Sequence, residues 1–510
     1  MLGLREPQRS FFGAIAQLGR EAIMAMGFYG QLAMNAVFKD EDFAGAYDSK
    51  NGRPSVPPSM LAIARLLQHY DGISDAEVIE KTRYDLRYKA ALDLEPYSID
   101  APFAKSTFQA FRARLTLHEQ EGLAFERSIQ LALENGLLPK KLRLALDSAP
   151  VRGKGAVKDT FSLLSDAIAA VIRAVASKSK QKAEKVAEEA GLGRYVNDTG
   201  TSIKGSEIVD WDSQEDVSRF LEGILEECEQ AVNLGEDAEC AGDEIWLLKK
   251  IIEQDIEQDE AGTSKLGKGV AKDRNPSVTD PDMRHGRKSS GKAFNGHKAH
   301  VAVDETSGVI LAVEVSSPGE ADGEKVSDLI EQSKENTGRE VSGAVGDCAY
   351  GSATAQAQAE SQGIELDSKM PSPPKGKFGP GAFKVSDDGQ TATCPAGHPS
   401  MKQYQAKEGT LHIWSPDLCE ECPLKPKCTK AAKRQLIVRQ DFHSRRQRES
   451  WARSEEGRMV LRKRVIVEHA IGRIKNLGAG TARYFGQAKT KTQWLWTAAV
   501  ANLSLIWSQM

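Results

Sequence analysis

The sequence lacks features that mark several classes of protein. It has no run of 18 or more apolar residues, so we expect no membrane-spanning helix. Its first ten residues, MLGLREPQRS, lack the basic and then apolar pattern of a secretory signal, which makes the cytoplasm the expected location. It also lacks a net positive charge, because 68 Lys and Arg stand against 72 Asp and Glu. The total charge alone therefore gives no indication of a polyanionic partner.

The charge is, however, distributed unevenly along the chain. Residues 205–260 contain 19 acidic and 3 basic side chains, whereas residues 421–491 contain 19 basic and 6 acidic ones. The acidic segment therefore conceals a basic C-terminal third in the total. A basic segment of this kind suits a polyanion such as DNA, although a solvated charged surface explains the charge equally well.

The first 135 residues are predicted to be helical. PSMLAIARLLQHY (58–70) has apolar residues at helical spacing, and a helix over 73–92 is expected to begin after Ser74, with Glu77 completing a capping box. A further helix is expected to open on Ser106. Because these helices carry Arg and Lys without a clear helix-turn-helix pattern, the region is predicted either to bind DNA or to act as a scaffold.

Alternating apolar residues predict a different architecture after residue 135. The expected order is three strands, a helix, a strand, a helix, a strand and a final helix that contains Glu468. The short ETSG connection predicts an antiparallel hairpin within this set, so the fold class is mixed α/β. The predicted strands are 142–146, 297–304, 308–316, 340–347 and 364–369, and the predicted helices are 322–338, 352–363 and 462–475.

Two long segments interrupt this core and divide the chain. We predict a helical N-terminal domain over 1–135 and a core made of 136–155, 290–370 and 455–510. Residues 156–289 form a helical acidic insertion with a loop, and residues 371–454 form a cysteine-rich insertion. Long insertions between core elements are usually functional or disordered.

Three carboxylates are the main candidates for chemistry. Asp147 and Asp347 each follow an apolar strand, and the ends of strands are where an open α/β sheet places functional residues. Either aspartate alone is explained better as a cap at a strand-to-loop turn. Glu468 lies in the basic segment RKRVIVEHAIGRIK, with Arg464 four residues before it and Lys475 seven after it, on one helix face.

Carboxylates from two strands and one helix can hold two Mg²⁺ or Mn²⁺ ions, because hard oxygen ligands suit these metals. Two such ions activate a water or hydroxyl and stabilise the leaving oxygen of a phosphodiester. Arg464 and Lys475 are then expected to grip the phosphate backbone. The alternative for Glu468 is an ordinary helix salt bridge with Arg464.

The order of these motifs resembles that of the bacterial insertion-sequence transposases of the DDE class. The matching segments are LALDSAPVRG, AVGDCAYGS and RVIVEHAIGRIK, and FNGHKAHVAVDE and DPDMRHGRKSSGKAFNGHKAH resemble further segments of the same enzymes. Arg464, Glu468 and Lys475 fit the spacing of the family's Tyr-Arg-Glu-Lys signature, but Leu461 stands at the tyrosine position, which puts any role of that phenol in doubt.

The resemblance implies an RNase H-like catalytic core in which Asp147, Asp347 and Glu468 hold two metal ions. It implies an enzyme that cuts double-stranded DNA at the ends of its mobile element and joins the freed 3′-hydroxyl to a target. It also implies a homo-oligomer on paired DNA ends, in the bacterial cytoplasm at the nucleoid. The alternatives are a catalytically silent DNA-binding descendant of a transposase and an RNase H-like nuclease without strand transfer.

Four of the seven cysteines lie close together in the sequence. Cys419 and Cys422 have the C-x₂-C spacing with which two thiolates bind one zinc ion, and Cys394 and Cys428 can complete a four-thiolate site in a zinc-ribbon-like module. His398 and His412 are weaker candidates. The alternative is a set of reduced, buried thiols without metal.

Three further residues are candidates for DNA contact. Arg152 and Lys154 follow Asp147 in a glycine-containing loop that suits a phosphate. His300 lies on the strand expected beside that of Asp147, where it can approach the metals or the phosphate, although packing in the core explains it equally well.

Overall fold

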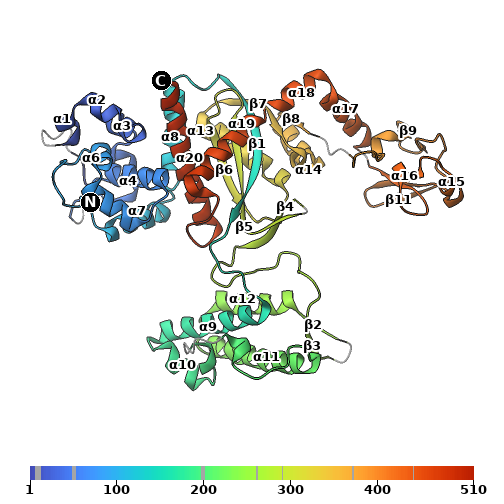
Figure 1. Cartoon of the computed structure of the whole chain (residues 1–510), viewed down its shortest axis with the longest axis horizontal. Helices are drawn as coiled ribbons and strands as arrows, with labels where there is room; N and C mark the ends of the chain where they lie inside the picture. Colours follow the sequence, from blue (N-terminus) through green and yellow to red (C-terminus); the bar gives the residue numbers. More distant parts are fainter. Residues whose placement is uncertain are drawn as a thin grey trace.

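The computed structural model describes residues 1–5, 13–48, 53–196, 202–259, 262–289, 291–369, 373–439 and 441–510, to which every structural statement below refers. Figure 1 shows a central sheet with N-terminal helices on one side, a second group of helices beneath it and a small β-rich part on the other side. The boundaries predicted after residues 289 and 370 involve residues 290 and 370–371, which lie outside the described ranges.

The central sheet is mixed, as the alternating strands predict. Its order is β6-β5-β1-β7-β8, with β4 paired to the first half of the long strand β5. The pairs among β1, β4, β5 and β6 are antiparallel, whereas β7 is parallel to β1 and β8 is parallel to β7. The strands are β1 (Lys141–Arg152), β4 (Arg284–Ser289), β5 (Lys292–Asp304), β6 (Ile310–Ser316), β7 (Glu340–Gly346) and β8 (Glu365–Ser368).

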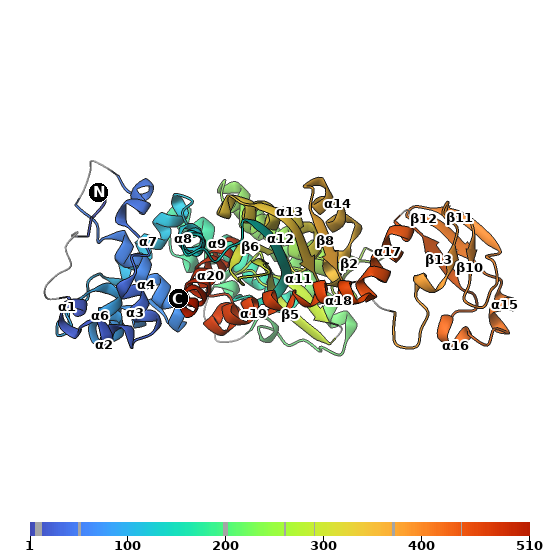
Figure 2. The ribbon, with the colours of Figure 1, turned by 90° about the horizontal axis from the view of Figure 1, so that it is seen from above.

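Helices cover both faces of this sheet, so its central strands are apolar on both sides. Figure 2 shows α13 (Val326–Thr337) and α14 (Ala353–Ser361) on one side and α19 (Val465–Ile474) on the other. The helix α20 (Gln487–Gln509) packs against β6 and also against the N-terminal helices. The buried side chains of the sheet and of the N-terminal helices consequently form one continuous core.

The N-terminal helices differ from the prediction in two details. The single helix expected over 73–92 is two helices, because Asp85 caps the second one with its side chain on the Arg87 N–H. Ser106 lies inside a helix that begins one residue earlier. The elements are α1 (Ala14–Leu18), α2 (Arg20–Met24), α3 (Phe28–Met34), η1 (Asp40–Ala46), α4 (Pro58–Asp71), α5 (Asp75–Tyr84), α6 (Leu86–Leu92), α7 (Lys105–Leu117) and α8 (Leu123–Glu134).

The helices between β1 and β4 have a buried cluster of their own. They are α9 (Thr160–Ser179), α10 (Ala183–Glu189), α11 (Gln214–Asp237) and α12 (Gly242–Asp255), followed by the short pair β2 (Ile256–Gln258) and β3 (Ser264–Leu266). By length and composition, α9 alone among the described helices is long and apolar enough to cross a membrane. It packs against α10, α11 and α12, as core helices do, so it is weak evidence for a membrane span.

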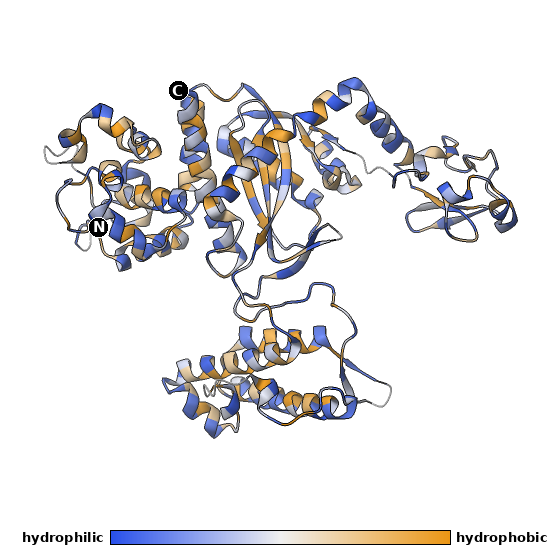
Figure 3. Ribbon diagram, viewed as in Figure 1, coloured by the Kyte–Doolittle hydropathy of each residue, from blue (hydrophilic) through white to orange (hydrophobic). Residues whose placement is uncertain are grey.

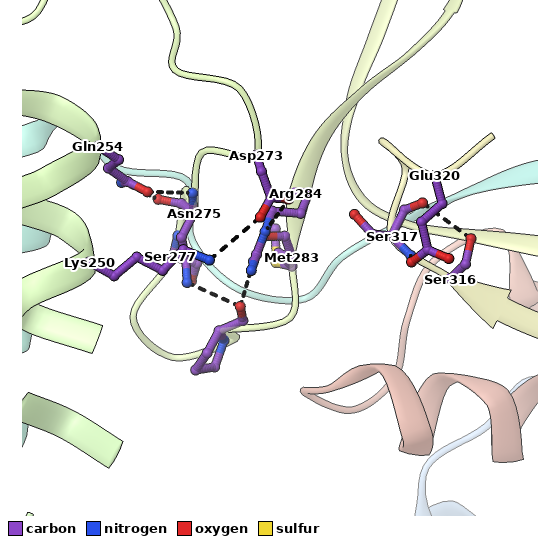
Figure 4. Close-up of polar contacts among 11 residues, drawn as sticks. Lys250, Gln254, Asp273, Asn275, Ser277, Met283, Arg284, Ser316, Ser317 and Glu320 are labelled. Atoms are coloured by element: carbon purple, nitrogen blue, oxygen red, sulfur yellow. Dashed lines mark hydrogen bonds and ion pairs between the residues drawn. The ribbon is translucent and has the colours of Figure 1, made fainter. Parts of the chain in front are cut away.

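A network of polar contacts connects these helices to the sheet (Figure 4). Asp273, in the loop before β4, lies 3.6 Å from Lys250 of α12 and 2.8 Å from Arg284 of β4. In the same loop, the Asn275 N–H donates to Gln254 at 2.8 Å, and the Gln254 amide donates to the Asn275 carbonyl at 3.0 Å. The acidic helices are therefore attached to the sheet by directed contacts next to the chain connection.

The cysteine-containing segment folds around a small core that includes Phe383, Trp414 and Leu436. The chain returns to the sheet through α17 (Phe442–Arg453) and α18 (Glu455–Arg462), which Figure 1 shows between the two parts. The other elements of the segment are β9 (Lys384–Val385), β10 (Ala392–Thr393), β11 (Lys402–Ala406), β12 (Gly409–Ile413), α15 (Pro416–Glu420), α16 (Lys425–Cys428) and β13 (Gln435–Val438).

Candidate functional site

Asp147 does not end its strand, contrary to the prediction. β1 continues to Arg152, because Ser148–Arg152 pair with β5 as far as Gly296. The parallel pairing of β1 with β7, however, stops at Ala145 opposite Val345. Asp147 therefore lies where β7 leaves β1, which frees one side of the strand for a functional side chain.

Asp347 follows the last residue of β7 and caps the short turn η5 (Cys348–Gly351). Its carboxylate accepts a hydrogen bond from the Ala349 N–H at 2.8 Å. Because Ala145 pairs with Val345 in a parallel ladder, Asp147 and Asp347 each lie two residues beyond the last pair. The register thus brings the two aspartates to the same level of the sheet.

Glu468 lies in the first turn of α19. The helix predicted over 462–475 is interrupted, since α18 ends at Arg462 and α19 begins at Val465 with Arg464 as its N-cap. The guanidinium of Arg464 forms ion pairs with Glu468 and, at 3.3 Å, with Asp147. The expected salt bridge of Glu468 with Arg464 is therefore present, and it extends to the first aspartate.

The three carboxylates are near enough for the charges of two of them to affect the pKa of the third. Burial, together with the charges of Asp347 and Glu468, raises the pKa of Asp147 to about 6, although the Ser148 N–H and Arg464 oppose the shift. Lys475, which follows α19, has a lowered pKa because of burial and the neighbouring Lys288, while Asp147 favours its charged form. Residues far apart in sequence are thus assembled around Asp147.

The donor set of this site suits a hard divalent cation, because it consists of carboxylate oxygens. In the described parts of the chain, no three His, Cys, Asp or Glu side chains form a group that can hold a metal ion. The Arg464 guanidinium neutralises two of the three carboxylates as they stand. The residue types nevertheless fit magnesium or manganese.

The site contains a fourth acidic residue, Asp322, which the sequence did not indicate. Asp322 accepts hydrogen bonds from the Ser148 hydroxyl at 2.7 Å and from the Lys298 ammonium at 2.8 Å. Tyr350 is fully buried, its hydroxyl has no partner among the described residues, and burial together with Asp322, Asp147 and Asp347 raises its pKa. In the sequence, Asp322 is an acidic residue before a helix, which is a common cap and gives no signal of its own.

The remaining predicted DNA-contact residues differ in exposure. Arg152 is exposed at the end of β1, and the exposed Lys154 donates to the Arg483 carbonyl at 2.9 Å. His300 is fully buried and lies 2.9 Å from the Ser316 hydroxyl, and burial lowers its pKa to about 4. The expectation that His300 meets DNA or metal is therefore not supported, and core packing accounts for it.

The four clustered cysteines line one pocket, although among the described residues they too do not form a group that can hold a metal ion. Cys394, Cys419, Cys422 and Cys428 are free thiols that line one pocket together with His398. Burial raises the pKa of Cys428, and the other three thiols raise it further. His412 is turned away from a ligand role, since its two ring nitrogens lie 3.0 Å from Ser400 and from the Gly389 carbonyl.

Two family models match parts of the chain. The model described as "Transposase DDE domain" matches residues 393–507, and that described as "Transposase domain (DUF772)" matches residues 32–114. The first match includes Glu468 and the four cysteines, and the second covers N-terminal helices. No curated protein and no solved structure matches the chain.

Proposed function

We propose that this chain, which the two family matches indicate to be an insertion-sequence DDE transposase, cuts DNA at the ends of its mobile element and joins the cut strands to a target. The observation that carries this proposal is the proximity of three carboxylates. Asp147 and Asp347 each lie two residues beyond the last pair of β1 with β7, and Arg464 pairs with both Asp147 and Glu468. The sheet order β6-β5-β1-β7-β8 further supports an RNase H-like core.

In the proposed mechanism, Asp147, Asp347 and Glu468 would hold two Mg²⁺ or Mn²⁺ ions, and such ions would supply positive charge for activating a water or hydroxyl and for stabilising the leaving oxygen. Arg464 exchanges its two carboxylate partners for a phosphate of the DNA, since a guanidinium binds phosphate and carboxylate in the same forked geometry. Lys475, Arg152 and Lys154 contact the backbone on either side. The hydrogen bond from Ser148 to Asp322 holds the protein main chain next to Asp147 in place.

We propose a structural role for the cysteine-containing segment. Cys394, Cys419, Cys422 and Cys428 would hold one zinc ion, which closes a segment whose own core is small. Thiolates suit zinc and not magnesium, so this ion has no part in the DNA chemistry.

The proposed partners are double-stranded DNA and further copies of the same chain on paired DNA ends, in the bacterial cytoplasm at the nucleoid. Two alternatives have the same fold: a silent DNA-binding protein and a nuclease that cuts without joining. A single experiment separates the three. Purified protein with Mg²⁺ or Mn²⁺ is incubated with a plasmid carrying the gene and its native flanking DNA, together with a labelled target plasmid.

Cuts at discrete flanking positions together with joined target products are the expected result. Cuts without joined products would favour the nuclease, and binding without cuts would favour the silent protein. Either of these two results would contradict the proposed strand transfer.

A further inference from the structure

We infer that a cleft between α17, α18 and the ends of β7 and β8 binds the sugar-phosphate backbone of DNA that extends from the cutting site. This inference rests on the proposed function and names a binding surface for its substrate. The cleft is lined by Gly346, Lys369, Glu449, Ala452, Arg453, Arg458, Leu461, Arg462 and Arg464.

The lining is strongly and asymmetrically charged, with five cations and one acid. Arg453 pairs with Glu449, and Arg464 pairs with Asp147 and Glu468. Within the described ranges, no ion pair is found for the other three cations, Lys369, Arg458 and Arg462, all of which are exposed. Like charges gathered in one cleft repel each other, so the cleft is complementary to a polyanion.

The cleft adjoins the three carboxylates directly. Gly346 immediately precedes Asp347, and Arg464 contacts both Asp147 and Glu468 while it also lines the cleft. α18 packs against β7 and β8, which fixes the cations beside the carboxyl ends of these strands. If one phosphate of a DNA strand lies at the carboxylates, the phosphates that follow it along the strand can therefore contact the cations of the cleft.

The surface of α17 and α18 favours DNA over an apolar partner. Figure 3 shows α17 as mainly hydrophilic, in contrast to the apolar strands of the sheet. An acidic segment of another copy is the competing occupant, because residues 205–260 are strongly acidic. DNA is favoured because the cleft continues a site whose proposed substrate is DNA.

The test measures the affinity of the full chain for DNA duplexes over a range of salt concentrations. One duplex carries the native flanking DNA of the gene, and the other is unrelated. The variant Arg458→Glu/Arg462→Glu and each of its two single variants are compared with Arg173→Glu, which reverses one charge on an exposed arginine of α9. Arg458→Gln/Arg462→Gln provides a milder change in case charge reversal disturbs folding.

We expect the Glu variant to bind DNA at least about 10-fold more weakly at low salt, and the slope of log affinity against log salt to fall by about two, one for each lost phosphate contact. Arg173→Glu should leave both unchanged. A loss of affinity and slope on only one duplex also supports the cleft. It then shows whether the cleft binds the DNA of the element end or unrelated DNA. Unchanged slopes on both duplexes, or lost self-association with intact DNA binding, would overturn the inference.

Different results would contradict the proposed function and the proposed binding of DNA in the cleft. If the wild type never cuts DNA but the slopes still fall, the cleft stands and the proposed cutting activity does not. If the wild type cuts DNA and the slopes are unchanged, the cutting activity stands and the cleft does not.

Discussion

The carboxylate site and the cysteine site are assembled in opposite ways. Asp147 and Glu468 are brought together across the sheet by long-range packing of β1, β7 and α19, and an arginine neutralises them. The four cysteines lie within residues 394–428, and three of them, Cys394, Cys419 and Cys428, pack on the small core of that segment. The first site depends on the whole core, whereas the second is local. We therefore expect loss of the cysteines to affect folding, and loss of the carboxylates to affect chemistry.

The largest effect on folding is expected from removal of a thiol pair. Cys419→Ser/Cys422→Ser should abolish zinc binding, and with it the folding of residues 373–439, because structural zinc in small modules contributes on the order of 10 kcal/mol. Zinc content by elemental analysis should be about one ion per chain in the wild type, and proteolysis should cut the variant within this segment.

Cys240→Ser is the matched control, because Cys240 lies among the acidic helices. It should keep the zinc content of the wild type. A fully reduced wild type that contains no zinc and resists proteolysis would show that the thiols pack without metal.

A smaller effect of opposite sign is expected from Asp147→Asn. Asp147 has a folded pKa of about 6, above its ordinary 3.8, so the folded state binds the proton more tightly. The wild type should therefore lose stability as the pH rises from about 4 through 6, by at most about 3 kcal/mol. Asn does not titrate, so in metal-free buffer the variant should gain stability over the wild type at pH 8 and lose this advantage near pH 4.

Urea unfolding at both pH values, followed by fluorescence of the buried Trp494 and Trp496, measures this difference. Asp387→Asn, an exposed position in the cysteine-containing segment, should change the free energy of unfolding little. An Asp147→Asn variant that is less stable than the wild type at pH 8 would mean that the Arg464 ion pair outweighs burial.

The smallest effect is expected from Tyr350→Phe. The Tyr350 hydroxyl is buried without a hydrogen-bond partner among the described residues, so its removal should leave stability unchanged or raise it by about 1 kcal/mol. Thermal unfolding measures the effect. Destabilisation by more than about 1 kcal/mol would show that the hydroxyl is satisfied, for example by a water between Asp322 and Asp147.

Sequence periodicity predicted most of the sheet, because β5, β6, β7 and β8 alternate or run apolar between polar turns. It missed the second half of β1, where Asp147-Ser-Ala-Pro resembles a loop, and it missed β4, which lies in the segment predicted as the loop of the acidic insertion. Pro150 is tolerated in β1 because the edge opposite β5 has no continuous ladder after Ala145. That edge has only a bridge from Arg152 to Thr481, so the missing N–H of Pro150 interrupts no ladder there.

The sequence pointed to Asp147, Asp347 and Glu468 but gave no indication of Asp322 or of the contacts around these residues. The break between α18 and α19 has no Pro or Gly to announce it, and it places Arg464 at a helix start. Asp322 lies in the short helical turn η4 (Asp322–Lys325), which packs against α13, α14 and η5, and only this packing brings it to Ser148. The position of His300 on a strand left both contact with DNA and packing in the core open, because the exposure of a strand residue depends on the helices that cover it. These are tertiary effects, which local patterns do not encode.

The central claim is that Asp147, Asp347 and Glu468 form one metal-dependent cutting site. Cleavage of the plasmid with native flanking DNA in Mg²⁺ or Mn²⁺ should be compared for the wild type, Glu468→Gln and Glu331→Gln, an exposed glutamate of α13. We predict discrete cuts by the wild type and by Glu331→Gln, a loss of at least about 100-fold in Glu468→Gln, and undiminished DNA binding in all three. Cleavage by Glu468→Gln at the wild-type rate would contradict the claim.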